Sequence, residues 1–271
     1  MALSQQAIWI AFGLTMIAGL ATGIGSLIAL VAKRTNTKFL CATLGFSAGV
    51  MLFVSFMDLL PIAKEELVLH LGAKSGMLFL LLSFFGGMGL ITLIDFLIPG
   101  ANNPHEFQGI EDMNRPNDRQ KSLHRMGIVM ALSLAIHNFP EGIATFTAAM
   151  SSGLSVAIPI TFAIAIHNIP EGIAVSVPIY HATGNKRKAF WLSFLSGLAE
   201  PVGALIAYLF LLSFWSPLIN GIVMSSVSGI MVYISLDELL PTAEKYGEHH
   251  ISISGLIAGM VIMALSLFLF I

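Results

Sequence analysis

Cysteine and charged residues are both scarce in this chain. Its 271 residues include one cysteine, Cys41, and only 10% charged residues, against 56% hydrophobic residues and a mean hydropathy of +0.86. A single cysteine excludes an internal disulfide and a metal site built from several thiolates. So few charges cannot cover a soluble surface, and the sequence therefore predicts an integral membrane protein that lies in a lipid bilayer. The formal net charge of −2 gives no sign of a nucleic-acid partner.

The chain also lacks the alternating segments of about 10 residues that a membrane β-barrel requires. Its apolar residues instead form runs long enough for a membrane-spanning α-helix, which takes about 20 residues. We therefore predict an all-α protein, with one transmembrane domain over residues 1–271, eight helices and a cytoplasmic loop at 99–125. The predicted helices are 8–31, 39–61, 76–98, 126–150, 155–178, 189–212, 217–240 and 253–271.

Positive charge lies mainly on one side of these predicted helices. Of the 13 Lys and Arg residues, all but Lys64 and Lys74 fall in the first, third, fifth and seventh loops between the predicted helices, which lie on one side of the membrane. Loops rich in Lys and Arg stay on the cytoplasmic side. The distribution therefore predicts that both chain termini lie outside.

Two internal repeats indicate how the helices are arranged. Residues 49–63 align with 229–243, including a shared Leu-Leu-Pro ending, and residues 19–29 align with 197–207. In the predicted orientation the two members of each pair cross the membrane in opposite directions. The fourth and fifth helices lie between the repeats, so the sequence predicts an inverted 3+2+3 arrangement. Inverted repeats are typical of secondary transporters, which bind their substrate near the bilayer midplane.

A polar phrase, His-Asn-x-Pro-Glu-Gly, occurs in both the fourth and the fifth predicted helix. It begins at His137 and recurs thirty residues later at His167. The His and Glu of each copy stand four residues apart, on one helix face. Folding the chain back about residue 153 predicts that His137 faces Glu171 and that Glu141 faces His167, near the bilayer centre. Such a cluster suits a divalent metal ion.

Each copy of the phrase also contains a proline. Pro140 and Pro170 have no backbone N–H, so the carbonyls of Ile136 and Ile166 lose their helical partners and both helices are predicted to kink there. A freed carbonyl that lines a cavity can bind a cation or its water. Proline is also common in ordinary membrane helices, so neither residue alone indicates a site.

A third acid, Glu200, lies inside the sixth predicted helix. Its counterpart in the repeat is the neutral Thr22, so only one half of the repeat contributes a charge. An acid at the centre of a membrane helix costs roughly 2.5–3.5 kcal/mol on insertion scales. Glu141, Glu171 and Glu200 together therefore predict a cation, or protons, that offset their charge.

These residues resemble a known family. The two phrases, the Gly-Leu-Ala-Glu of residues 197–200 and the Asp-Glu-Leu-Leu-Pro of residues 237–241 resemble the ZIP family of zinc and iron transporters, and most closely its bacterial members of the ZupT type. The similarity covers essentially the whole chain. It implies a homodimeric importer of divalent metal ions in the bacterial inner (plasma) membrane, with a binuclear site and an elevator-like motion. It implies neither enzymatic activity nor a bound cofactor.

The resemblance also implies a set of metal ligands. Three ligands lie in each copy of the phrase and one lies in the sixth helix, while Met51 of the second helix is a possible additional ligand. The set is His137, Asn138, Glu141, His167, Asn168, Glu171 and Glu200. Imidazole, carboxylate and amide groups suit zinc, iron(II), manganese, cobalt and cadmium, whereas the absence of thiolates disfavours Cu(I).

The loop between the third and fourth predicted helices departs from the family pattern. Family members commonly carry a histidine-rich stretch there, but residues 99–125 contain only His105 and His124. We therefore do not expect this loop to chelate metal. His249 and His250, in the last inner loop, are candidates to meet an exiting ion, although adjacent histidines in polar loops are more often solvated.

Buried carboxylates are compatible with two other functions. A proton- or sodium-coupled transporter of another solute would use them as proton relays, and a membrane metalloenzyme would use them to hold a catalytic metal. The sequence contains neither His-Glu-x-x-His nor His-x-x-x-His, which disfavours the enzyme.

Overall fold

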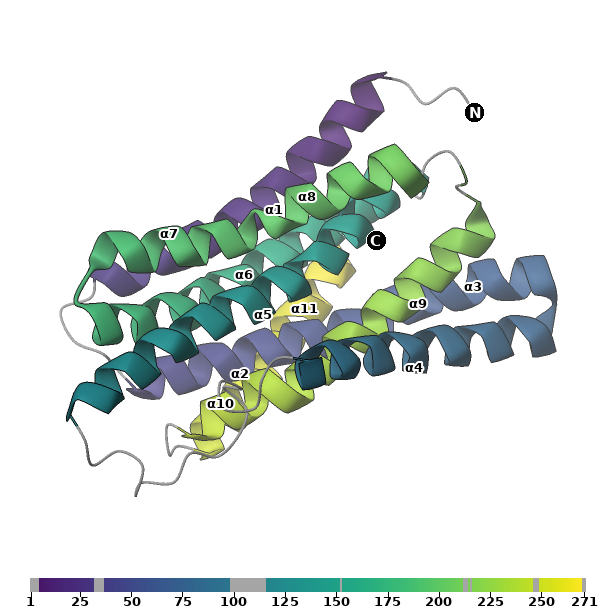
Figure 1. Cartoon of the computed structure of the whole chain (residues 1–271). Helices are drawn as coiled ribbons and strands as arrows, with labels where there is room; N and C mark the ends of the chain where they lie inside the picture. Colours follow the sequence, from purple (N-terminus) through teal and green to yellow (C-terminus); the bar gives the residue numbers. More distant parts are fainter. Residues whose placement is uncertain are drawn as a thin grey trace.

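The part of the chain described by the computed structural model is helical throughout and contains no strand (Figure 1). This part comprises residues 5–31, 37–97, 116–151, 153–211, 214, 216–245 and 249–269. The predicted all-α class is therefore confirmed.

The helices are numbered along the chain, with π-helical segments labelled η. They are α1 (Gln5–Val31), α2 (Thr37–Val54), η1 (Ser55–Leu59), α3 (Leu60–Leu71), α4 (Ala73–Leu97), α5 (Pro116–Ser151), α6 (Leu154–Thr183), α7 (Lys186–Gly197), α8 (Ala199–Ile206), η4 (Ala207–Leu211), α9 (Pro217–Ile234), η6 (Ser235–Leu239), α10 (Leu240–Lys245) and α11 (His249–Leu269).

Seven helical segments of the described chain are long and apolar enough to cross a membrane. They are Gln5–Val31, Cys41–Leu71, Ala73–Ile94, Ala157–Val177, Lys186–Phe210, Pro217–Glu244 and His249–Phe268. The remaining predicted span, 126–150, lies within α5, which is not among the seven. The chain is thus a multi-pass membrane protein by the length and composition of its helices.

The last residues of the predicted loop 99–125 are helical in the structure. Residues 116–125 form the first turns of α5, which begins with Pro116. Proline is well suited to the first helical position, because its fixed φ angle fits the helix and no N–H is needed there. His124 therefore lies on α5, although its side chain is outside the described atoms, and residues 99–115, with His105, are outside the described residues.

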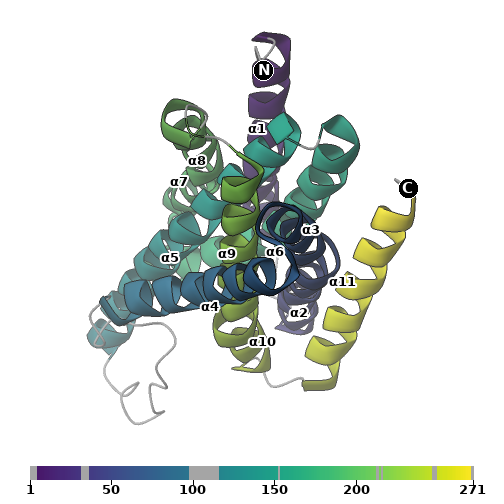
Figure 2. The same cartoon turned by 90° about the vertical axis from the view of Figure 1, so that its right-hand side faces the viewer.

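The helices form two groups that meet along the length of the molecule (Figure 1). The first group contains α1 and α5 to α8, and the second contains α2 to α4 with α9 to α11. The groups meet mainly where α2 packs against α6 and where α5 packs against α9. Figure 2 shows α11 at the edge of the second group, beside α2.

Two π-helical segments occupy equivalent places in the predicted repeats. η1 follows α2 and η6 follows α9, and each is followed by a leucine and then by Pro61 or Pro241. In η1 the N–H of Leu60 donates to the carbonyl of Ser55, one residue further than in an α-helix. A proline cannot donate to the carbonyl four residues before it, so the helix is already irregular where this wider turn forms.

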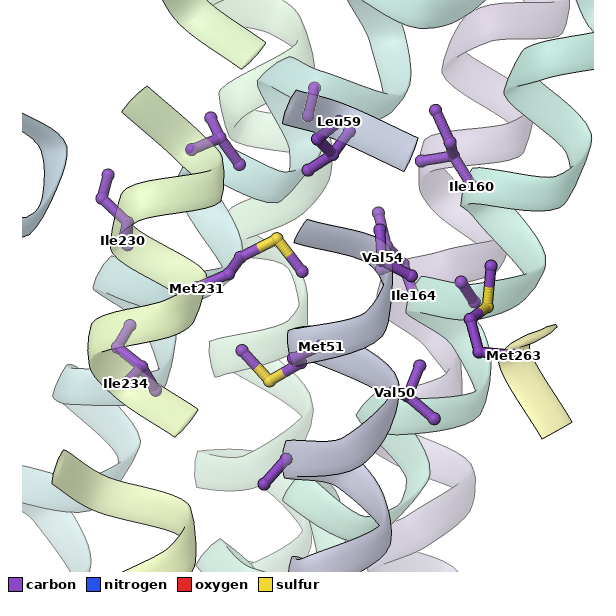
Figure 3. Close-up of a cluster of buried hydrophobic side chains, with 14 of the residues drawn as sticks. Val50, Met51, Val54, Leu59, Ile160, Ile164, Ile230, Met231, Ile234 and Met263 are labelled. Carbon is purple, nitrogen blue, oxygen red and sulfur yellow. The ribbon is translucent and has the colours of Figure 1, made fainter. Parts of the chain in front are cut away.

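A large apolar core lies between α2, α6, α9 and α11 (Figure 3). Met51 is fully buried there, and Figure 3 shows its side chain extending into the same space as that of Met231. Ile164 of α6 and Met263 of α11 close other sides of this core. Unbranched methionine side chains fill such irregular spaces well.

Candidate metal centre

The two copies of the polar phrase lie on neighbouring helices. α5 and α6 pack against each other as an antiparallel hairpin, joined at Gly153. Gly153 has a φ of 83°, a conformation that glycine adopts without strain. Both helices continue through their prolines, Pro140 and Pro170, so the hairpin presents Glu141 and His167 at matching depths.

Glu141 and His167 contact each other across the hairpin. Nε2 of His167 lies 3.1 Å from Oε1 of Glu141, and both side chains are at least 99% buried. The predicted fold-back pairing of these two residues is confirmed. The partner pair in that prediction, His137 with Glu171, involves a side chain outside the described atoms, because only the backbone of His137 is described, on α5.

Glu200 joins the site from α8. It accepts a hydrogen bond from Nδ2 of Asn168, which also donates to the carbonyl of Ala18 at 3.0 Å. The helix is interrupted at Leu198, between α7 and α8, and Glu200 lies in the first turn of α8. Pro201 has no N–H to donate to the carbonyl of Gly197, which accounts for this break within the predicted helix 189–212.

The remaining predicted ligands are buried on the same two helices. Glu171 of α6 is 1% exposed, and Asn138 of α5 is fully buried. Asn138 donates from Nδ2 to the carbonyl of Ser196 on α7 at 3.3 Å. Within the described atoms, its Oδ1 and the Oδ1 of Asn168 have no hydrogen-bond partner. Amide oxygens in this state can serve as metal ligands.

The three acids of this site lie near one another. Glu141 and Glu171 are both neighbours of Glu200. In the part of the chain that the structure describes, no group of three His, Cys, Asp or Glu side chains is close enough to hold a metal ion. Among the described contacts, Glu141 pairs with His167 and Asn168 pairs with Glu200.

Glycines fix the helices that surround the hairpin. A Cβ atom on Gly142 would lie 1.9 Å from the carbonyl oxygen of Glu200, and one on Gly172 would lie 1.9 Å from that of Thr22. No side chain larger than hydrogen fits at either place. These glycines directly follow the two glutamates of the phrases, so close backbone packing positions α8 and α1 beside the acids.

Two further polar contacts could not be predicted from the sequence. Nδ2 of Asn220 on α9 lies 2.8 and 2.7 Å from the two carboxylate oxygens of Glu66 on α3. The hydroxyl of Ser47 on α2 donates to the carbonyl of His167 at 3.3 Å. Both contacts join residues more than a hundred positions apart, and no local sequence pattern predicts them.

The predicted exit histidines lie at the start of α11. Nδ1 of His249 lies 2.8 Å from Oε1 of Glu244, and the His249 ring contacts that of His250 edge to face. Both members of the His249–Glu244 pair are at least half exposed. Exposed pairs of this kind contribute little to stability.

Acids, imidazole and amides buried between the helices of a multi-pass protein are typical of membrane transporters for polar solutes or ions. The family model described as ZIP Zinc transporter matches residues 5–267. The chain belongs to this family. It is therefore a transporter rather than an enzyme, and a multi-pass protein of the bacterial inner (plasma) membrane.

Several curated bacterial proteins are similar over nearly their whole length. A zinc transporter ZupT from Clostridium perfringens is 57% identical over 274 residues, which covers 96% of each chain. The protein of that name from Streptococcus mutans is 56% identical over 267 residues, covering 98% of this chain and all of the relative. The one from Chlorobium chlorochromatii is 56% identical over 261 residues, or 96% and 97% of the two chains.

Proposed function

We propose that this protein imports zinc into the bacterial cytoplasm through the site between α5, α6 and α8. The similar proteins named above are zinc transporters by name. Buried imidazole and carboxylate groups are the ligands that zinc prefers in the absence of cysteine. The chain supplies both groups at the contact of Glu141 with His167.

We further propose that iron(II), manganese, cobalt and cadmium are carried as well. The amide oxygens of Asn138 and Asn168 add neutral oxygen ligands to the carboxylates, and oxygen ligands suit these harder ions. The chain has one cysteine, Cys41, which is buried in the apolar core, so it cannot form a site of several thiolates. Copper(I) is accordingly not expected as a substrate.

The proposed ligands form a site for two ions. They are His137, Asn138, Glu141, His167, Asn168, Glu171 and Glu200. Two ions that share Glu141 and Glu171 would repel each other at about 3.5–4 Å and so would leave the site more readily. Calorimetric titration tests this: one tightly bound ion per protomer, even at high zinc concentration, contradicts the two-ion site.

Met51 is an additional proposed ligand. Its thioether is buried in the core drawn in Figure 3, on the helix that packs against α6. Met51→Leu conserves volume and should cost less than about 1.5 kcal/mol of stability. A higher KM for zinc uptake at an unchanged melting temperature would support a ligand, and an unchanged KM would contradict one.

The proposed topology has eight membrane spans, including α5, in an inverted 3+2+3 arrangement with both termini outside. Equivalent positions of η1 and η6, and of Gly142 and Gly172, support the repeat. The distribution of Lys and Arg supports the orientation. We also propose a homodimer, as the resemblance to the family implies.

The contact of Glu141 with His167 carries the proposed function, and zinc uptake tests it. Purified protein in liposomes should take up radioactive zinc, and Glu141→Ala with Glu171→Ala should lower the rate at least a hundredfold, because two of the three buried acids are lost. The control removes an exposed acid instead, with Glu65→Ala, and should leave uptake unchanged. Equal uptake by the unaltered protein and the site variant contradicts the proposal.

A further inference from the structure

Thr22 and Glu200 occupy equivalent places on the two sides of the α5–α6 hairpin. α8 meets α5 where the carbonyl of Glu200 faces Gly142, and α1 meets α6 where the carbonyl of Thr22 faces Gly172. In both cases a Cβ atom on the glycine would lie 1.9 Å from the carbonyl oxygen. The backbone around the site is therefore nearly the same on its two sides, while the side chains differ by one carboxylate.

The asparagines of the two phrases repeat this equivalence. Asn168 donates to the carbonyl of Ala18 on α1, and Asn138 donates to the carbonyl of Ser196 on α7. Ala18 and Ser196 stand immediately before the two aligned stretches of the repeat. Asn168 has a second partner, the carboxylate of Glu200. By the same repeat, Thr22 is to Asn138 what Glu200 is to Asn168.

Polar atoms on the Thr22 side lack partners among the described atoms. They are Oγ1 of Thr22, Oγ of Ser26 and Oδ1 of Asn138, and all three side chains are fully buried. A Cβ atom on Gly197 would lie 2.8 Å from Oγ1 of Thr22, so this hydroxyl lies beside Gly197, which follows the Ser196 whose carbonyl Asn138 binds. Buried polar groups in folded proteins are usually satisfied, often by an ordered water.

We propose that Thr22 is a specificity-determining residue. Its hydroxyl holds a water ligand of the ion that Asn138 and Glu171 bind, where the other side of the site uses the carboxylate of Glu200. This inference rests on the proposed metal transport. A neutral side attracts a divalent ion less than a charged one, and it favours ions such as manganese(II) that suit water ligands.

Uptake of manganese and zinc by the full-length protein in liposomes tests the role of Thr22. Thr22→Val keeps the shape of the side chain and removes the hydroxyl, so the manganese-to-zinc ratio of uptake rates should fall at least fivefold. Thr22→Ser keeps the hydroxyl and should retain the original ratio. Thr22→Glu gives the second side a carboxylate, and should lower the KM for zinc and lower kcat at least tenfold because the ion is released more slowly.

Thr15→Val is the matched control. Thr15 is also buried on α1, but its hydroxyl donates within the helix to the carbonyl of Ala11 at 2.9 Å, so this variant should keep the original ratio. An unchanged ratio in Thr22→Val overturns the proposal, as does an equal fall in the Thr15 and Thr22 variants. If the unaltered protein carries no zinc, the proposed transport fails. If it carries zinc and Thr22→Val behaves identically, only the role of Thr22 fails.

Discussion

At the scale of single residues, the contact of Glu141 with His167 couples metal binding to protons. Nε2 and Oε1 are 3.1 Å apart, a distance at which a proton lies between them. Zinc bound to Nε2 displaces that proton, which a neutral imidazole can carry on Nδ1, whereas a protonated acid or an imidazolium must release a proton to bind the metal. A zinc ion that enters the site therefore competes with protons for the same atoms.

We predict that zinc binding releases protons and weakens as the pH falls. Titration calorimetry in buffers of different ionisation enthalpy measures the number released. His167→Ala, which removes one partner of the pair, should release fewer protons per zinc than the unaltered protein. The same heat of binding in every buffer would show that no proton leaves.

The Glu141–His167 pair was predictable from the sequence, whereas the partner of Glu200 was not. Four-residue spacing and a short turn at Gly153 determine which residues of two adjacent antiparallel helices meet. The contact of Glu200 with Asn168 joins α8 to α6, and it depends on how those helices are rotated and on the break at Leu198. Neither property is encoded in local periodicity.

At the scale of helices, the glycine after each buried glutamate sets how closely two helices approach. Gly172→Ala would place a methyl group 1.9 Å from the carbonyl oxygen of Thr22. We predict that α1 and α6 move apart, at a cost of about 1–3 kcal/mol. The melting temperature in detergent should fall by several degrees. Zinc uptake should fall at least tenfold, because Glu171 is the adjacent residue.

Gly86→Ala is the control for this substitution. Gly86 lies in α4, and a Cβ atom there would meet nothing within 4 Å. Alanine is the better helix former by roughly 1 kcal/mol, so this variant should be as stable as the original protein or slightly more so. Equal melting temperatures of the Gly172 and Gly86 variants would show that the close contact is not rigid.

The hydrogen bonds between Asn220 and Glu66 connect α9 to α3. Asn220 is fully buried, and its amide nitrogen contacts both oxygens of the carboxylate. Asn220→Ala should lower the free energy of unfolding by roughly 1.5–3 kcal/mol, the usual contribution of a hydrogen bond to a charged group. Chemical unfolding in detergent measures the change. Glu65→Ala removes the adjacent exposed acid and should have little effect, so equal stability of the two variants would argue against the connection.

The sequence did not indicate how the helices are wound at the Leu-Leu-Pro stretches, and the predicted ends near residues 61 and 240 were wrong, because both helices continue past the prolines to Leu71 and Lys245. The Leu-Leu-Pro endings of residues 49–63 and 229–243 marked two equivalent places, and both contain a π-helical segment in the structure. A proline predicts a missing hydrogen bond. Whether the helix kinks, breaks or widens depends on neighbours, such as Ser228, whose hydroxyl donates to the carbonyl of Ser55.

At the scale of the whole molecule, the proposed orientation in the membrane rests on the distribution of Lys and Arg and can be tested directly. After Cys41→Ala removes the one native cysteine, single cysteines at Lys74 and Arg187 report the two sides, since both residues are exposed. A membrane-impermeant maleimide should label Lys74→Cys in intact cells and Arg187→Cys only after the cells are opened. The reverse pattern would invert the proposed topology.

The glycine contacts also have a mechanical consequence for the molecule. Where backbone meets backbone, as at Gly142 with Glu200 and at Gly172 with Thr22, no rotamers are available to absorb strain. α1 and α5 to α8 therefore behave as one stiff block that holds the contacts of Glu141, Asn138 and Asn168 at fixed spacing. Side chains that pack on side chains can adjust by changing rotamer, so movement is easier at the surfaces of the block than inside it. Thermal motion should therefore displace the whole ion site as a unit rather than distort it.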